Sequence, residues 1–408
     1  MRDLQRLIDR NAATFSARYS EALLDEKMFA GDPVADRAAV ALHERNYDRT
    51  VDKLAAIRAL AANGESVARE FLCTVAEPPG WLDRKAIEAG QNVMLGFVSL
   101  SRLSLMHSLF AGGVFARAAL VTQATGRLGA NPATRIRETA AFIAAILQPG
   151  GLDAGALGYE TTLRVRLLHA SIRAWLKRLP DFSRDYVGEP IDQTMLAMTI
   201  CLFSYLNLRS FARLGVWLSE GEREALHHLW RYVGWLLGVE DALLAHSLGQ
   251  ERELWSALVA HQAFGEDWGA HLLEESVRSA AALTREHGDT GPFFRSLFLH
   301  LSGPQWFGLR EAPPVDARLR ALRAANIARS LRRRWIPGAA SRMSADGLEA
   351  FDRSVELARA HTFDVRIETP QDNARATSAI KALGAAVRAR FGDAQARHAG
   401  KTRAGGTR

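Results

Sequence analysis

The sequence has few cysteines and none of the short motifs that mark several common enzyme classes. Its 408 residues include two cysteines, Cys73 and Cys201, which lie far apart and form no CxxC pattern. This spacing argues against a disulfide scaffold and against a zinc ribbon. No HExxH, GxSxG, P-loop or dinucleotide-binding pattern occurs, which argues against a zinc protease, an α/β-hydrolase and the common nucleotide-binding folds.

The sequence also lacks a long uncharged run. Residues 1–10 alternate charged and apolar side chains and contain no apolar core of a signal peptide. The longest uncharged run, 193–208, is too short and too polar to span a bilayer. We therefore expect a cytoplasmic protein.

Strand signals are nearly absent, whereas helix signals extend along the chain. Apolar residues recur every three to four positions in stretches rich in Ala, Leu, Arg and Glu. Asn131 is a candidate N-cap for a helix over 132–147, which has Pro at its first position. Ser219 and Glu222 form a capping box for a helix that reaches about residue 238. The sequence predicts an all-α fold.

The chain divides into zones at its breaks rich in Pro and Gly. We predict an N-terminal helical extension over 1–79, a core over 80–248 and a C-terminal helical region packed on it over 249–391. The tail, 392–408, ends in a stretch without apolar content and is predicted to be disordered. No composition shift separates independent domains, so we expect one helical core with extensions.

One predicted helix carries a histidine between two arginines. Arg166 precedes His169 by three positions and Arg173 follows it by four, so the three share one helix face beside an apolar stripe. Two guanidiniums and an apolar setting both disfavour the imidazolium, and the neutral imidazole is the form that binds a metal ion. The same spacing also fits a buried histidine bound to a backbone carbonyl, with surface arginines. Spacing alone leaves both readings open.

The segment 164–173, Arg-Val-Arg-Leu-Leu-His-Ala-x-x-Arg, resembles the haem-ligand helix of the latex-clearing proteins, or rubber oxygenases. Oxygenases that cleave the side chain of mycophenolic acid belong to the same superfamily. Further matching segments occur in the same order before it, at 125–128, 135–139, 149–152 and 158–159, and after it, at 188–193, 203–204, 215 and 230–238. The resemblance covers about 112–238.

This resemblance implies a globin-like helical core that holds non-covalent haem b. His169 matches the iron ligand, and Arg166 and Arg173 match the paired arginines around it, which would suit anionic groups such as haem propionates. In the family, haem and dioxygen cleave an isoprenoid carbon–carbon double bond, and both oxygen atoms end in carbonyl groups. Because no export signal is visible, we expect a smaller isoprenoid, terpenoid or unsaturated lipid as substrate.

The distal side departs from the family pattern. The resemblance places Arg135, Glu138 and Thr139 there, but rubber-cleaving members have a lysine where this chain has Glu138, and an upstream carboxylate as proposed base. No Asp or Glu occurs between Glu88 and Glu138. We predict that Glu138, oriented by Arg135, is the distal acid or base. A first-turn glutamate that stabilises the helix dipole is the alternative.

An apolar channel beside the haem would need large apolar side chains. The sequence offers six aromatic candidates for its lining, each of which also suits ordinary core packing: Phe97, Phe110, Phe115, Phe142, Phe203 and Trp235.

The segment 318–335 is a basic amphipathic helix that contributes to the net charge of +7. Such a helix suits weak contact with an anionic membrane surface or with nucleic acid. A solvated Arg-rich face over a Leu stripe is the simpler interpretation, and nucleic acid is not favoured. We expect a monomer or a homodimer.

Three functions stay open from the sequence. The first is a haem-dependent oxygenase acting on a hydrophobic substrate. The second is a haem protein that senses or carries, which the unmatched distal groups favour. The third is a haem-free helical interaction protein with a basic surface.

Overall fold

The computed structural model is helical throughout its described part. The structure describes residues 14–45, 52–125, 132–179, 182, 187–262, 266–283, 289–307, 311, 314–360 and 370–405. No β-strand occurs in these ranges. The all-α prediction is confirmed.

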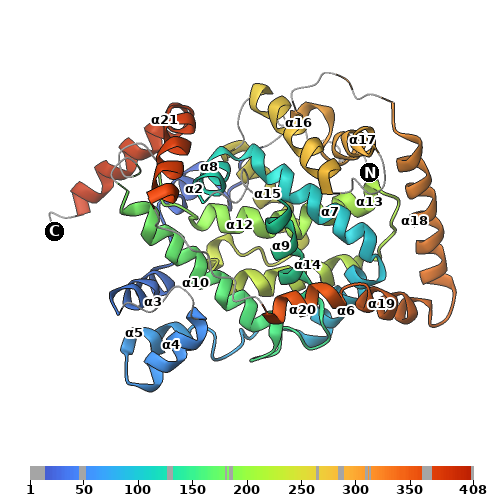
Figure 1. Ribbon diagram of the computed structural model, residues 1–408, viewed down its shortest axis with the longest axis horizontal. Coiled ribbons are helices and arrows are strands. Elements are labelled where there is room, and N and C mark those ends of the chain that lie inside the picture. The colour runs from blue at the N-terminus through green and yellow to red at the C-terminus, as the bar shows by residue number, and fades with distance from the viewer. Residues whose placement is uncertain are drawn as a thin grey trace.

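The helices follow one another through short connections (Figure 1). The N-terminal part contains α2 (Glu21–Lys27), α3 (Pro33–Glu44), α4 (Lys53–Ala62) and α5 (Ser66–Cys73). The central part contains α6 (Arg84–Gly96), α7 (Val98–Ala111), α8 (Ala116–Ala124), α9 (Pro132–Leu147), α10 (Leu157–Lys177), α12 (Gln193–Phe203), α13 (Tyr205–Arg213) and α14 (Glu220–Leu236). The C-terminal part contains α15 (Leu248–Gln262), α16 (Glu266–Leu283), α17 (Gly291–Ser302), α18 (Ala317–Trp335), α19 (Ala339–Glu349), α20 (Asp352–Ala360) and α21 (Pro370–Gly405).

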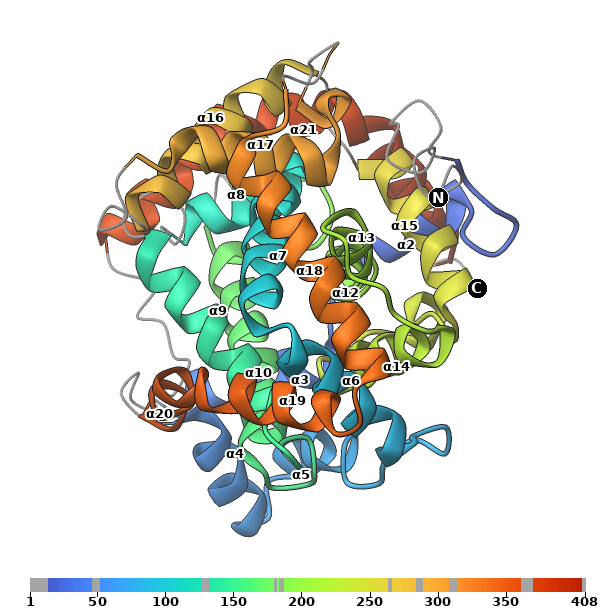
Figure 2. The same ribbon diagram turned by 90° about the vertical axis from the view of Figure 1, so that its right-hand side faces the viewer.

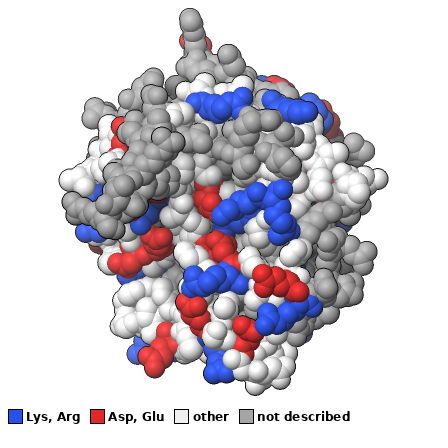
Figure 3. All heavy atoms as spheres, turned by 90° about the vertical axis from the view of Figure 1, so that its left-hand side faces the viewer, with Lys and Arg blue, Asp and Glu red and all other residues white. Residues whose placement is uncertain are grey.

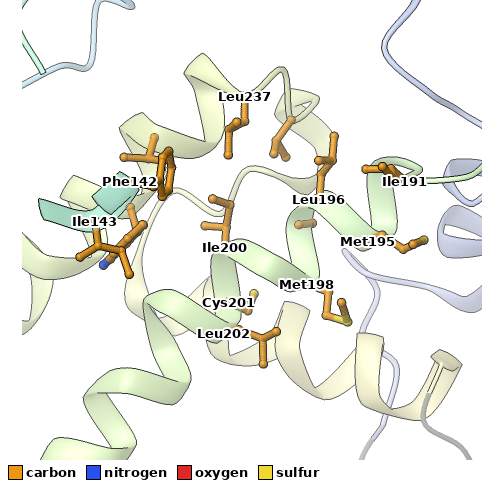
Figure 4. Packing of buried hydrophobic residues seen from close by; sticks show 14 of the residues in the cluster. Phe142, Ile143, Ile191, Met195, Leu196, Met198, Ile200, Cys201, Leu202 and Leu237 are labelled. Atoms are coloured by element: carbon orange, nitrogen blue, oxygen red, sulfur yellow. The ribbon is translucent and has the colours of Figure 1, made fainter. Parts of the chain in front are cut away.

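Helix α12 lies in the middle of the molecule (Figure 1). It is apolar on all sides, and nine of its eleven residues are buried, as expected for a helix surrounded by others. Asp192 caps its N-terminus by accepting hydrogen bonds from the backbone N–H groups of Thr194 and Met195. Figure 4 shows its apolar side chains packed with Phe142 and Ile143 of α9.

Helices α9 and α10 cross closely. A Cβ at Gly158 would lie 2.6 Å from the carbonyl oxygen of Ala145, a distance that no larger residue tolerates. The glycine near the start of α10 therefore lets the backbones approach. This contact aligns α10, which carries His169, against α9, which carries the predicted distal residues.

Both predicted extensions pack on the central helices. Helix α3 packs on α10, and α19 packs on α6, while α20 lies on α9 and α21 on α8. Figures 1 and 2 show these outer helices wrapped around the central ones. The zone boundaries themselves stay predictions.

The apolar stretch Gln193–Arg213 is long and apolar enough to pass a simple test for a membrane span, as is the pair α6 and α7 if read as one segment. However, 83% of the apolar window in Gln193–Arg213 is buried inside the protein, and α6 and α7 meet at an angle of 96°. Helices in the core of a protein show this behaviour.

Local signals predicted several helices correctly. Helix α9 spans Pro132–Leu147 as expected, and α14 begins at Glu220 behind a complete capping box formed by Ser219 and Glu222. The C-terminus differs from the predicted disordered tail, since α21 continues to Gly405. Alanine and arginine, which are strong helix formers, occur throughout this segment and favour the helix. Residues 406–408 lie outside the described residues.

Candidate functional site

A cavity of about 240 Å³ lies among α7, α8, α10 and α12, with one residue from α9. Most of its wall is apolar. The aliphatic and sulfur-containing side chains come mainly from α12 and from Ile191, which precedes it. Figure 4 labels several of them. Of the six aromatic candidates, Phe110 and Phe203 line the cavity. The ring of Phe203 stacks on Trp230, with centroids 5.0 Å apart.

His169 reaches this cavity from α10. Leu168 and Ile172, which share the adjacent part of the helix surface, line the same wall. The His169 side chain is half-buried, and its Nδ1 atom is inaccessible to solvent. The apolar stripe predicted for this helix is confirmed, because Leu168, Ile172, Trp175 and Leu179 are all buried.

Hydroxyl groups supply most of the other polar atoms of the cavity wall. Those of Ser108, Thr122, Thr125 and Thr199 donate to backbone carbonyls three or four residues earlier in their own helices. Thr139 of α9 also lines the cavity, and its hydroxyl makes no hydrogen bond within the described part of the protein. Thr139 is therefore the wall residue with a hydroxyl that can donate to a bound molecule.

Arg166, one turn before His169, is bound to a carboxylate. Its Nε lies 2.6 Å from Asp32 Oδ2, its Nη2 lies 3.1 Å from Oδ1, and its Nη1 donates to the Thr74 hydroxyl. Both members of the ion pair are buried. Gly238, at a φ of +81°, covers the pair so closely that a Cβ there would lie 2.4 Å from Asp32 Oδ2.

Arg173, one turn after His169, is engaged in the same way. Its Nε lies 2.7 Å from Asp36 Oδ1, and its Nη1 donates to the carbonyl oxygen of Ile191. Burial raises the pKa of the Asp36 carboxyl, and the guanidinium of Arg173 opposes that rise. Neither arginine is among the cavity-lining residues.

Ile191 has an unusual backbone. Its φ is 51°, the left-handed region that a β-branched residue rarely adopts and that costs about 1–3 kcal/mol. The hydrogen bond from Arg173 holds its carbonyl, and its side chain lines the cavity. Arg173, on the same helix as His169, thus holds Ile191 in place on the cavity wall.

A further ion pair, buried on both sides, lies near Ile191. The guanidinium of Arg117 on α8 contacts Asp192 and donates to the carbonyls of Val187 and Glu189, and both charged side chains are buried. Burial raises the pKa of Asp192, and Arg117 opposes that rise. No pattern in the sequence pointed to this pair, to Asp32 or to Asp36.

The predicted distal residues reach the site to different degrees. Thr139 lines the cavity, whereas Glu138 is half-buried on α9 and is not a lining residue. The side chain of Arg135 lies outside the described residues. No Asp or Glu lines the cavity within the described part, and no arginine or lysine does so either.

The sequence matches the model of one protein family. Residues 86–348 match the family described as "ER-bound oxygenase mpaB/B'/Rubber oxygenase, catalytic domain". The chain belongs to this family. The match includes α10 with His169, the helices that line the cavity and most of α19.

Individual relatives agree with membership in the rubber oxygenase family. The chain is 26% identical over 229 residues to the rubber oxygenase of Streptomyces sp. (strain K30), an alignment that covers 53% of this chain and 55% of that protein. The aligned part thus spans about half the length of that relative. A solved structure of latex clearing protein LCP in the closed state is similar with a TM-score of 0.53 at 20% identity, over 80% of this chain and 90% of that one. This structural similarity shows the fold.

Proposed function

We propose that this protein is a haem b-dependent oxygenase that uses dioxygen to cleave a carbon–carbon double bond of a hydrophobic substrate. The observation that carries the proposal is the half-buried imidazole of His169 on the wall of an apolar cavity. Membership in the rubber oxygenase family supports the same reaction class.

The residues at the cavity fit haem b better than a bare metal ion. Structural and catalytic zinc sites use three or four protein ligands, and the described residues contain no group of three His, Cys, Asp or Glu side chains that would hold an ion. Haem needs a single axial side chain and apolar walls. His169 with Leu168, Ile172 and Phe203 supplies both.

Haem b, when bound, supplies the iron chemistry that activates dioxygen, and the chain supplies position and polarity. His169 would hold the haem iron from α10. The Thr139 hydroxyl, which also lines the cavity, would donate a hydrogen bond to a bound molecule, and Glu138, oriented by Arg135, would take or give a proton. If Glu138→Gln left oxygen uptake with substrate intact, the role of Glu138 would be wrong.

Arg166 and Arg173 have a second candidate role besides binding propionates. Arg166 binds Asp32, the N-cap of α3, and Arg173 binds Asp36 within α3, so the two arginines fix the position and rotation of α10 and hence of the imidazole. Binding of haem propionates by these arginines stays a prediction.

The apolar wall favours a small isoprenoid, terpenoid or unsaturated lipid as substrate. The cytoplasmic location expected from the sequence stays a prediction, as does the choice between monomer and homodimer.

The absorption spectrum of the purified protein tests the haem proposal. We expect a Soret band as isolated or after addition of haemin, and its loss in His169→Ala. His246→Ala is the matched control, because His246 is exposed and pairs with Asp241 on the surface. Colourless protein that does not bind haemin would exclude both haem functions and leave the helical interaction protein.

A haem sensor or carrier is the second candidate function. It is favoured by the absence of Asp and Glu from the described cavity wall, since a cleaving enzyme is expected to present a base. Oxygen uptake with a panel of isoprenoids separates the two: a carrier consumes no oxygen in proportion to substrate.

We also propose that the end of α18 contacts an anionic membrane surface. Four large apolar side chains there are exposed: Trp217, Leu331, Trp335 and Ile336. The backbone N–H of Trp217 donates to the hydroxyl of Ser330 on α18. This hydrogen bond places the loop between α13 and α14 beside α18. The exposed Arg329, Arg332 and Arg334 supply positive charge.

A further inference from the structure

Helix α13 carries a buried cation with no counter-charge. Arg209 is only 3% exposed, and its Nε and Nη2 atoms are inaccessible to solvent and make no hydrogen bond. No Asp or Glu of the described residues forms an ion pair with it. Arg166, Arg173 and Arg117, the other buried arginines discussed above, each hold a carboxylate.

Two other buried donors without hydrogen bonds lie close enough to Arg209 to interact electrostatically with it. Tyr205 lies one turn before Arg209 on the same helix face, and its hydroxyl is buried without a hydrogen bond. His107 comes from α7, which packs against α13. Its Nε2 lies 2.6 Å from the Ser302 hydroxyl, and its Nδ1 is buried without a partner. When the Ser302 hydroxyl donates to Nε2, Nδ1 carries the ring proton and is a donor.

The electrostatics at this cluster is positive. Burial lowers the pKa of Arg209 to about 9, and the neighbouring Arg213 adds to that effect. Burial also lowers the pKa of His107 to about 3, with further contributions from Arg209 and Arg213. Glu251, the carboxylate that interacts electrostatically with Tyr205, is bound through its Oε2 by His227 and Ser204, and its Oε1 is buried without a hydrogen bond. A buried charge without a partner is strongly unfavourable, and an anion with matching acceptor capacity removes that cost.

We propose that Arg209, Tyr205 and His107 form a binding site for a small inorganic monovalent anion such as chloride, between α7 and α13. The donor atoms are closed off from solvent, which suits an ion of the size of a water molecule rather than an organic acid. None of the three residues lines the cavity beside His169, so this site is separate from the proposed haem site.

An anion at this position would connect two walls of the cavity. Helix α7 contributes Ser108 and Phe110 to the lining, and α13 begins two residues after Phe203. The anion therefore stabilises the packing of helices on which the shape of the cavity depends. The proposed anion site does not depend on the proposed oxygenase activity.

Crystals of the full chain grown with sodium bromide test the site directly. We expect an anomalous bromide peak within hydrogen-bonding distance of the Arg209 guanidinium and the Tyr205 hydroxyl. Bromide peaks at exposed arginines but none at Arg209 would overturn the proposal.

Thermal unfolding gives a second, independent test. At constant ionic strength, replacing gluconate with chloride should raise the Tm of the wild-type protein and saturate, as a bound ligand requires. Tyr205→Phe should weaken the apparent chloride affinity about tenfold, the equivalent of one lost hydrogen bond. Arg209→Met should abolish the chloride dependence, while Arg359→Met, an exposed control on α20, should keep it.

A wild-type Tm that is the same in chloride and in gluconate would contradict the proposal. If Arg209→Met fails to fold, the bromide peak in the wild-type protein and the Tyr205→Phe titration decide the question without it.

Discussion

The hydroxyl groups around the cavity differ in what they can donate. Four of them are committed to backbone carbonyls of their own helices, and Thr139 is not. A hydrogen-bond donor that is held in place but unused is the arrangement expected for binding a polar atom of a ligand. Thr139 thus presents an unused hydroxyl donor from a fixed position on a helix.

Thr139→Val should lower oxygen-dependent turnover about 10- to 100-fold while haem binding and stability stay unchanged, since one positioned donor is lost from the cavity. Thr199→Val is the control, because the Thr199 hydroxyl donates to the Met195 carbonyl. Equal rates for Thr139→Val and wild type in an oxygen-electrode assay would show that this hydroxyl has no part in the reaction.

His107 should make stability depend on pH. Its pKa in the folded protein, about 3, lies below the ordinary histidine value of 6.5, so between these values only the unfolded chain takes up a proton. The free energy of unfolding should therefore fall by about 1.4 kcal/mol per pH unit as the pH drops below about 6.5, and this contribution should be constant above it. Urea titrations in chloride-free buffer would measure the slope.

His107→Gln should remove that part of the slope, because glutamine does not titrate. His246→Gln, an exposed control, should keep it. The same slope in His107→Gln and wild type would mean that other groups cause the pH dependence.

At the residue scale, the sequence allowed His169 to be singled out but not its surroundings. The motif around His169 lies within one helix, and its spacing predicts a shared face. The partners of Arg166 and Arg173 lie 134 and 137 residues away, and helical periodicity carries no information on such distant pairs. The positive φ of Ile191 was equally invisible, because a β-branched residue does not favour it.

Among the helices, the important relationship is that of α10 to α3. Two ion pairs connect them on the side of α10 next to His169, and Gln193 donates to the carbonyls of Gly31 and Gly238 at the same junction. Breaking one partner of a buried pair leaves an uncompensated charge and costs several kcal/mol. The orientation of His169 thus depends on a helix from the N-terminal extension.

Gly238→Ala should destabilise the protein by about 2–4 kcal/mol, because the residue has a φ of +81° and a new Cβ would overlap Asp32 and Arg166. The affinity for haemin should fall as well, since α10 loses its anchor. Gly221→Ala on the exposed start of α14 is the matched control, as nothing lies near its Cβ. Chemical denaturation would detect the difference. A Gly238→Ala variant as stable as Gly221→Ala would show that the junction adapts.

Element boundaries were predictable where local capping decides them. The capping box at Ser219 and the proline at the start of α9 are such cases. The packing of α3, α19 and α21 on the central helices could not be predicted in this way. An amphipathic helix shows which of its faces is buried, but not which other helix covers that face. The cavity itself arises from that packing.

At the scale of the whole molecule, charge and exposed apolar surface are unevenly placed. On the face shown in Figure 3, basic and acidic side chains are interspersed. Helix α18, which crosses the face shown in Figure 2, instead has exposed arginines next to Trp217 and Trp335, which are 61% and 72% exposed. Aromatic rings beside positive charge suit the surface of an anionic bilayer.

Wild-type protein should co-sediment with phosphatidylglycerol-containing vesicles at low salt and less at high salt. Replacing both Trp217 and Trp335 by Ala should weaken binding at least about tenfold, since burial of each ring contributes on the order of 1–2 kcal/mol. Phe15→Ala, at an exposed apolar residue elsewhere, is the control. Salt-insensitive binding, or none to these vesicles, would argue against the contact.

Helices α12 and α13, which meet at Ser204, form one apolar stretch that matters during synthesis of the chain. As the stretch Gln193–Arg213 leaves the ribosome it is hydrophobic enough to be tested by the membrane-insertion machinery. A guanidinium costs about 2.5–3.5 kcal/mol at the centre of the hydrocarbon and less near the end of a spanning helix, where Arg209 and Arg213 would lie. These two arginines therefore weaken the tendency of this stretch to insert, without forbidding it.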